Sequence, residues 1–144
     1  MDEAAYQQKV SEMLDRPCTF EKAVLSGCVA CLRVQRVQIA EREAVTCRSA
    51  SCLSRCTALH ELLRHNFSFA LGLTHDNPVL PHAKEMRVQC GGLMGIQKIL
   101  NDSTDVDNVD ALLDSVLQQW GDLADIPYSE VVHAAALSYK GRHG

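Results

Sequence analysis

Aromatic residues are scarce in this sequence, and the signals of a membrane or secreted protein are missing. Phe, Tyr and Trp make up 5% of the residues, so the core must be built from Leu, Val, Ala and Cys. No apolar run is long enough to cross a bilayer. The first residues lack the basic and apolar regions of a secretory signal peptide. The sequence therefore predicts a cytoplasmic protein without a membrane span.

An excess of positive charge is also absent. The formal net charge is −4, and Lys and Arg form no continuous stripe. Because nucleic-acid binding depends on clustered Lys and Arg beside the phosphates, nucleic acid is not expected as a partner. A length of 144 residues suits one domain with one core. We expect a single helical domain over residues 1–144, with a flexible C-terminal tail at about 140–144.

Signatures of catalysis and of nucleotide or calcium binding are incomplete. There is no HExxH pair and no nucleophile elbow. The glycines of Gly91-Gly92-x-x-Gly95 lack the preceding strand and the Lys-Ser/Thr of a phosphate loop. Asp105, Asp107 and Asp110 lack the glycine and terminal Glu of a calcium loop, and are expected to supply negative charge at a helix start. The chain is therefore predicted to be an accessory or carrier protein rather than an enzyme.

The residues that are abundant favour helices. Ala, Leu, Gln, Glu and Arg dominate, and alternation of β-branched or aromatic residues is nearly absent. The predicted fold is all-α, a single-domain bundle of about five helices with a cysteine-ligated metal or cluster site. The expected helices cover residues 3–14, 19–45, 49–72, 82–89, 93–100, 109–117 and 128–139. Within the second of these, the segment 33–45 is a strong helix by composition, and Gly27 is a candidate break. Residues 74–78 are expected to form a loop, and Gly91-Gly92 to halt the helix before them.

Cysteine is the most informative residue of the chain. Six of the seven cysteines fall within the first 56 residues, and the seventh precedes two glycines. Structural disulfides are rare in a reducing cytosol, where clustered cysteines more often bind a metal or act in catalysis. The odd count also argues against a complete set of internal disulfides. The cysteines therefore predict a metal or cluster site.

The spacing of the cysteines favours an iron–sulfur cluster over other sites. Cys28 and Cys31 form a CxxC pair, but the second CxxC of a zinc ribbon and the βαβ context of a thioredoxin are missing. Four thiolates can hold a [4Fe–4S] cluster without a fixed spacing. Cys28 and Cys52 lie where core residues are expected and rank lower. The candidate ligands are Cys18, Cys31, Cys47, Cys56 and Cys90.

Other groups are expected to support the cluster. Gly91 and Gly92 offer backbone N–H groups for the cluster sulfurs, whose hydrogen bonds tune its potential. Cys18 precedes a predicted helix start, where the helix dipole favours a thiolate. His82 is the histidine best placed in sequence to act as a ligand or proton donor beside the site.

Geometry leaves two arrangements open. In one straight helix, Cys18 and Cys31 would lie roughly 20 Å apart, at about 1.5 Å per residue. In the first arrangement, the chain breaks near Gly27 and the fold brings Cys18 and Cys31 to the other cysteines. In the second, the site uses only Cys47, Cys52 and Cys56, with Cys90 from the later loop.

The expected function is electron transfer, or redox and cluster handling for a larger protein partner such as a redox enzyme or a cluster acceptor. A second hypothesis is a helical adaptor that binds a protein partner and is stapled by zinc or by no metal. A thiol-based redox switch is a third possibility. The cysteines also have a purely structural interpretation, since free Cys packs as a small hydrophobic residue.

Overall fold

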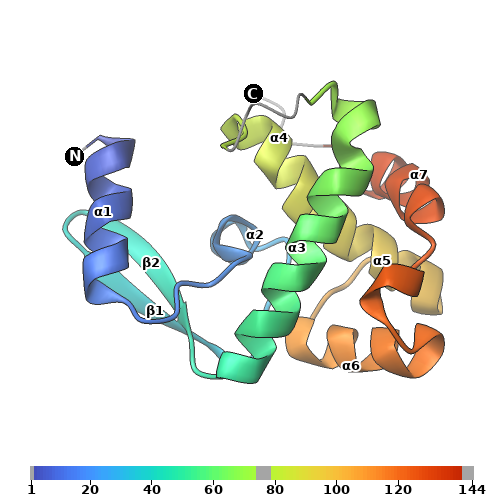
Figure 1. Ribbon diagram of the computed structural model, residues 1–144, viewed down its shortest axis with the longest axis horizontal. Helices are drawn as coiled ribbons and strands as arrows, with labels where there is room; N and C mark the ends of the chain where they lie inside the picture. Colours follow the sequence, from blue (N-terminus) through green and yellow to red (C-terminus); the bar gives the residue numbers. More distant parts are fainter. Residues whose placement is uncertain (1, 74–78, 141–144) are drawn as a thin grey trace.

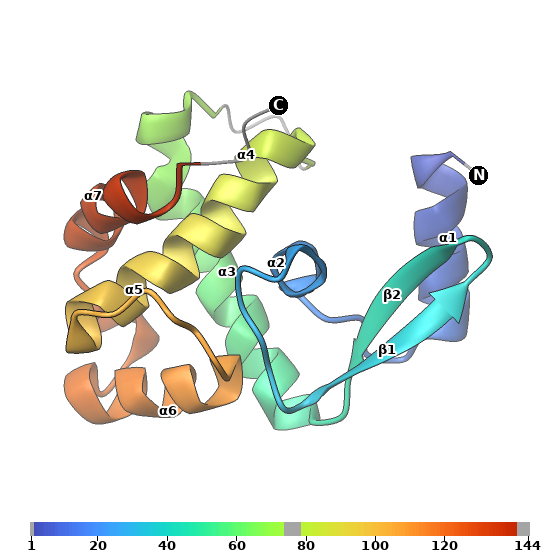
Figure 2. The ribbon, with the colours of Figure 1, turned by 180° about the vertical axis from the view of Figure 1, so that it is seen from behind.

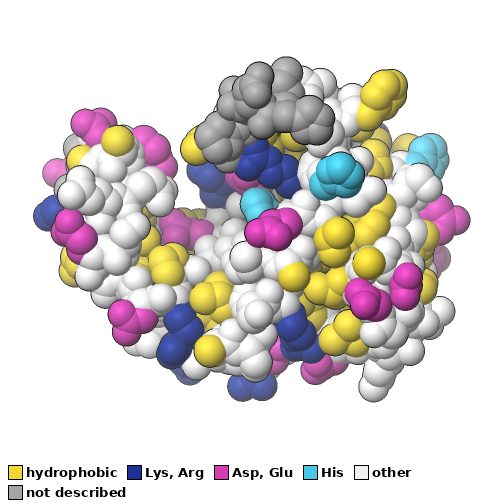
Figure 3. All heavy atoms as spheres, viewed as in Figure 1, with side chains coloured by type: hydrophobic (Ala, Val, Ile, Leu, Met, Phe, Trp, Pro, Cys, Tyr) yellow, Lys and Arg dark blue, Asp and Glu magenta, His cyan; other side chains and the backbone are white. Residues whose placement is uncertain are grey.

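The computed structural model describes residues 2–73 and 79–140, and these residues form a mostly helical protein with one small sheet. Figure 1 shows an N-terminal lobe, made of α1 and a β-hairpin, beside a body of helices. On the face drawn in Figure 3, a notch separates the lobe from this body. The elements are α1 (Glu3–Met13), α2 (Glu21–Ser26), β1 (Val34–Ile39), β2 (Arg42–Cys47), α3 (Ala50–Leu71), α4 (His82–Met86), the π-helical turn η1 (Arg87–Gly91), α5 (Gly92–Asn101), α6 (Val109–Trp120), the 3₁₀ turn η2 (Leu123–Asp125) and α7 (Tyr128–Ser138).

The predicted helical class is confirmed, but the strong helix expected at residues 33–45 is wrong. This segment forms the antiparallel hairpin β1–β2, in register from Val34 opposite Cys47 to Ile39 opposite Arg42. The turn places Ala40 in the left-handed region, at a φ of 54°. Helix propensity is a weak preference that tertiary packing overrides. Here the hairpin buries Ile39 against α1, which no local pattern reveals.

The N-terminal lobe has its own small core. Tyr6 and Val10 of α1 pack against Ile39 and Ala44 of the hairpin. The Tyr6 hydroxyl donates a hydrogen bond of 3.2 Å to the Glu43 carbonyl oxygen. The predicted opening helix is thereby confirmed, and its partner is the unexpected sheet.

The central helix α3 has the ends that its sequence predicts. Ser49 caps its start by accepting a hydrogen bond from the Cys52 N–H at 3.1 Å. Gly72 ends it in the left-handed conformation, with a φ of 63°, which glycine adopts without steric cost. One face of α3 packs into the main core through Cys52, Cys56, Leu59, Leu63 and Phe67.

The long helix that crosses α3 was expected to stop at Gly91-Gly92, and this prediction is wrong. Figure 2 shows α4 and α5 as one continuous helix, joined through η1. A Cβ atom at Gly92 would lie 2.8 Å from Leu63 Cδ1, and one at Gly95 would lie 2.7 Å from the Val131 carbonyl oxygen. The glycines therefore allow close packing of this helix against α3 and α7, instead of ending it.

The chain does break at Gly27, as one of the two predicted arrangements requires. Helix α2 ends at Ser26, and Gly27 has a φ of 84°. Thr19, the expected helix cap, instead lies 2.9 Å from the Thr57 hydroxyl oxygen, and Phe20 occupies the cap position. The break turns residues 28–33 back toward α6.

Some expectations lie outside the described residues. These are the loop at residues 74–78 and, within the predicted C-terminal tail, residues 141–144. The described helices include none with the length and apolar character needed to cross a membrane. The single-domain organisation stays a prediction.

Candidate thiol site

Five of the seven cysteines meet around one small cavity between the hairpin, α2, α3 and α6. They are the five that carry no disulfide. Apolar side chains and one threonine make up the rest of the wall. The cysteines are Cys18, Cys31, Cys47, Cys52 and Cys56, and the other lining residues are Thr19, Phe20, Val24, Val34, Leu53 and Val109. We refer to these five cysteines as the thiol site.

Strand pairing brings Cys18 and Cys47 together. The Cys18 N–H donates to the Val45 carbonyl oxygen at 2.8 Å, and the Cys47 N–H donates to the Arg16 carbonyl oxygen at 2.8 Å. The segment before α2 therefore runs along the edge of β2. Cys18 and Cys31 are partly exposed, whereas Cys47 is buried.

Helical spacing brings Cys52 and Cys56 together on α3. Residues four apart lie on the same face of a helix. Their sulfur atoms are 4.0 Å apart. Cys52 ranked low in the sequence prediction, but its i,i+4 relation to Cys56 was a signal that both would point to the same place.

The CxxC pair does not act as a unit. Val29, between its two cysteines, forms a parallel β-bridge with Val106, and the Ala30 N–H donates to the Val106 carbonyl oxygen at 2.9 Å. Successive residues of an extended chain point to opposite faces. Cys31 consequently faces the cavity, while Cys28 faces away from it.

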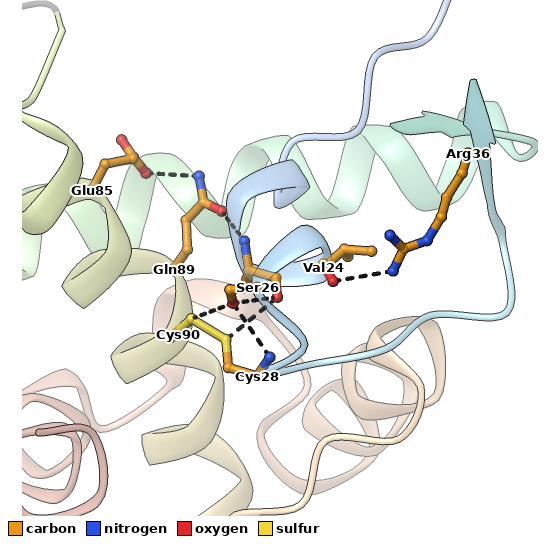
Figure 4. Close-up of a disulfide and its surroundings, with 8 residues drawn as sticks. Val24, Ser26, Cys28, Arg36, Glu85, Gln89 and Cys90 are labelled. Atoms are coloured by element: carbon orange, nitrogen blue, oxygen red, sulfur yellow. Dashed lines mark hydrogen bonds between the residues drawn. A yellow bond between two sulfur atoms is a disulfide. The ribbon is translucent and has the colours of Figure 1, made fainter. Parts of the chain in front are cut away.

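Cys28 instead forms a disulfide with Cys90 of η1, with an S–S distance of 2.02 Å (Figure 4). The Ser26 hydroxyl oxygen lies 3.7 Å from the Cys90 sulfur and accepts a hydrogen bond from the Cys28 N–H at 3.3 Å. Cys90, expected among the ligands, is thus separated from the other four candidates, because the π-helical turn aims it at Cys28.

The glycines expected to serve a cluster are also elsewhere. Gly91 packs against Ala135 and Gly92 against Leu63, inside the continuous helix. Neither lines the cavity of the thiol site.

His82 lies outside the thiol site as well. It is exposed at the start of α4, where its Nδ1 is 3.2 Å from the Lys22 ammonium nitrogen. Its place in the sequence, eight residues before Cys90, gave no measure of its distance from the other cysteines.

Burial keeps three sulfurs of the cavity, those of Cys18, Cys52 and Cys56, in the thiol form at neutral pH. Burial raises the pKa of Cys18 to about 12 and that of Cys56 to about 11. Burial also raises the pKa of Cys52, with further contributions from Cys56 and from the carboxylate of Asp110. Neutral thiols pack well in an apolar wall, and a bound metal cation would displace their protons.

The arrangement surrounds a common space without completing a coordination shell. The cavity has a volume of about 10 Å³, which is close to the space for one water molecule. Within residues 2–73 and 79–140, no three His, Cys, Asp or Glu side chains are set at the distances needed to hold a metal ion. Rotation of the cysteine side chains about Cα–Cβ would change these sulfur positions without moving the backbone.

Comparison with known proteins identifies no family for the chain. No family model matches it, and no curated protein or solved structure is significantly similar to it.

Proposed function

We propose that this protein holds an iron–sulfur cluster, [4Fe–4S] in its favoured form, and acts in electron transfer or cluster handling for a protein partner. The observation that carries the proposal is the convergence of the five disulfide-free cysteines on one apolar cavity. Iron–sulfur clusters are held by cysteine thiolates, and an apolar surrounding limits solvent access and tunes their potential. No catalytic role is proposed for the chain itself.

Four of the five cysteines are proposed as ligands: Cys18, Cys31, Cys47 and Cys56. Cys52 is the one left out, because burial, the neighbouring Cys56 and the Asp110 carboxylate all raise its pKa and so oppose a thiolate at that sulfur. Cys52 then packs against the cluster as a neutral thiol.

Loading a cluster requires the cavity to widen. Four irons and four sulfides need more room than the present volume of about 10 Å³. Cys18 and Cys31 lie outside the helices and strands, on segments at the surface side of the cavity. The wall at Cys18 can move with less disruption than α3, since its movement breaks no helical hydrogen bonds.

The partner is proposed to dock at the edge that carries Cys31. Leu32, the next residue, is 75% exposed. Arg48 is also exposed, and its backbone N–H donates to the Arg33 carbonyl oxygen at 2.7 Å, which places Arg48 beside this edge. A small apolar contact with a charged rim suits a transient redox or cluster-transfer complex. The proposed location remains the cytoplasm.

A zinc-stapled adaptor is the second candidate, and the small cavity volume favours it. One Zn²⁺ bound by four thiolates needs less room than a cluster of four irons and four sulfides. The adaptor would use the same exposed edge to bind a protein, with the metal in a purely structural role.

Anaerobic purification separates the two candidates. The cluster predicts a coloured protein with iron and acid-labile sulfide, and Cys56→Ala should lose both. Cys90→Ala is the matched control, because Cys90 is a buried cysteine outside the thiol site. Stoichiometric zinc without sulfide would support the adaptor instead. A chain that stays free of both metals after reconstitution with each would rule out both candidates.

A further inference from the structure

The first turn of α6 holds the residues on both sides of Cys31. The Val109 N–H donates to the Ala30 carbonyl oxygen at 3.0 Å. The Asn108 side-chain oxygen accepts a hydrogen bond from the Leu32 N–H at 3.0 Å. The short irregular segment that carries Cys31 is therefore fixed by contacts with a helix that contributes no cysteine.

Asp110, in the same turn, connects this segment to α3. Its Oδ2 accepts a hydrogen bond from Arg33 Nε at 2.7 Å, and its Oδ1 accepts one from Arg55 Nη2 at 2.6 Å. Arg33 follows Cys31 by two residues, and Arg55 directly precedes Cys56. One carboxylate thus bridges two walls of the thiol site.

The burial of Asp110 distinguishes it from an ordinary surface acid. It is one of two buried polar or charged residues in the described part of the chain, and its side chain is 12% exposed. Charge-assisted hydrogen bonds in such a setting are shorter and stronger than neutral ones. Asp114, one helical turn later, pairs with Arg55 at 2.7 Å and with no other described residue, and its side chain is 64% exposed.

We propose that Asp110 is a positioning residue of the thiol site, which sets the distance between Cys31 and Cys56 of α3 so that these two can share one metal centre. This assignment rests on the proposed function, because it requires that the thiol site binds a metal. Carboxylates that orient ligands from outside the coordination shell commonly change metal affinity by 10–100-fold when they are replaced.

The test compares Asp110→Asn with Asp114→Asn, because both remove one carboxylate from Arg55. Co²⁺ is the probe, since its thiolate complexes absorb in the visible and report ligand geometry. We expect Asp110→Asn to weaken Co²⁺ binding by about 10–100-fold and to change the thiolate absorption band. Asp114→Asn should leave both nearly unchanged, as expected for an exposed ion pair. Equal affinities in the two variants would overturn the assignment.

A second measurement needs no metal. In the metal-free protein, the alkylation rate of Cys31 is measured against that of Cys47 in the same molecule, so that a general loss of stability affects both. We expect Asp110→Asn to raise the Cys31 rate selectively and Asp114→Asn to leave the ratio unchanged. A ratio that stays constant in both variants contradicts the positioning role.

The two measurements separate the possible failures. If the unmodified protein binds neither cobalt nor iron, the proposed function fails, while the alkylation ratio still decides the role of Asp110. If metal binds but Asp110→Asn has no effect on it, the function stands and the positioning role is lost.

Discussion

The disulfide and the thiol site are two sulfur-containing regions that share one short segment of chain. Cys28 and Cys31 lie three residues apart, yet the first is bonded to Cys90 and the second lines the cavity. The β-bridge of Val29 with Val106 lies between them and directs them to opposite sides. Spacing along the sequence therefore does not decide which cysteines act together in this protein.

The two regions differ in what their sulfurs can contribute. The disulfide joins two cysteines that are 62 positions apart in the sequence. It is expected to stabilise the fold mainly by restricting the conformations of the unfolded chain. The thiols contribute as small apolar groups and are the groups to which we assign the proposed metal binding. One region is suited to holding the fold, and the other is suited to chemistry.

The largest effect should separate the two members of the CxxC pair. Cys31→Ser is expected to abolish stoichiometric metal binding, because it removes a sulfur from the thiol site. Cys28→Ser should retain the metal, since Cys28 faces away from the cavity. Metal analysis after anaerobic reconstitution measures both. Comparable loss in the two variants would show that the CxxC works as a unit after all.

Loss of the disulfide should have the next largest effect. Cys90→Ser is expected to lower the free energy of unfolding by about 2–4 kcal/mol under oxidising conditions, as is typical for a native disulfide. Urea unfolding with and without a reductant measures this. The difference should vanish in reductant, where the unmodified protein also lacks the bond. A difference that persists there would assign the effect to packing of the Cys90 side chain.

A substitution in the helical body should lower the free energy of unfolding by less than loss of the disulfide, and it should leave the thiol site unaffected. Gly95→Ala places a Cβ atom 2.7 Å from the backbone oxygen of Val131, and overpacking of this kind costs about 1–3 kcal/mol. Gly92→Ala meets the movable side chain of Leu63 and serves as the milder comparison. Urea unfolding ranks the two, and unchanged metal content in both would confirm that the regions are independent. A larger loss for Gly92→Ala would reverse the ranking.

The effect that is smallest near neutral pH appears only in alkaline solution. The pKa of Cys18 is raised from 9.0 to about 12 by burial, so the metal-free folded state keeps a proton that the unfolded chain loses. Its contribution to stability is present below about pH 9 and is lost as the pH rises toward 12. Urea midpoints across this range should fall less steeply in Cys18→Ala than in the unmodified protein. Parallel curves would contradict the burial of this thiol.

Local signals predicted the elements that have clear ends. The capping serine and terminal glycine of α3, and the apolar stripe of α6, depend only on neighbouring residues. The hairpin could not be predicted in this way. It depends on the packing of Ile39 and Ala44 against α1, whose residues lie some thirty positions away in the sequence.

The same limit applies to the thiol site. Four of the five expected ligands line one cavity because the chain breaks at Gly27, which the sequence offered as one alternative. The position of Cys90 depends on the π-helical turn, which leaves no recognisable mark in the sequence. The two ion pairs of Asp110, on which its proposed role rests, involve arginines from distant segments.

The π-helical turn at Arg87–Gly91 allows one helix to meet two sets of neighbours. A residue advances an α-helix by about 100°, since 3.6 residues complete a turn. The turn that contains Cys90 is wider than an α-helical turn. It therefore changes the direction in which Gly95 points toward α7, relative to the helix residues before the turn. The helix that contains this turn carries both Cys90 with its disulfide and Gly95 with its close contact to Val131. The disulfide and a close helix–helix contact therefore lie on the same helix, on the two sides of a change in its winding.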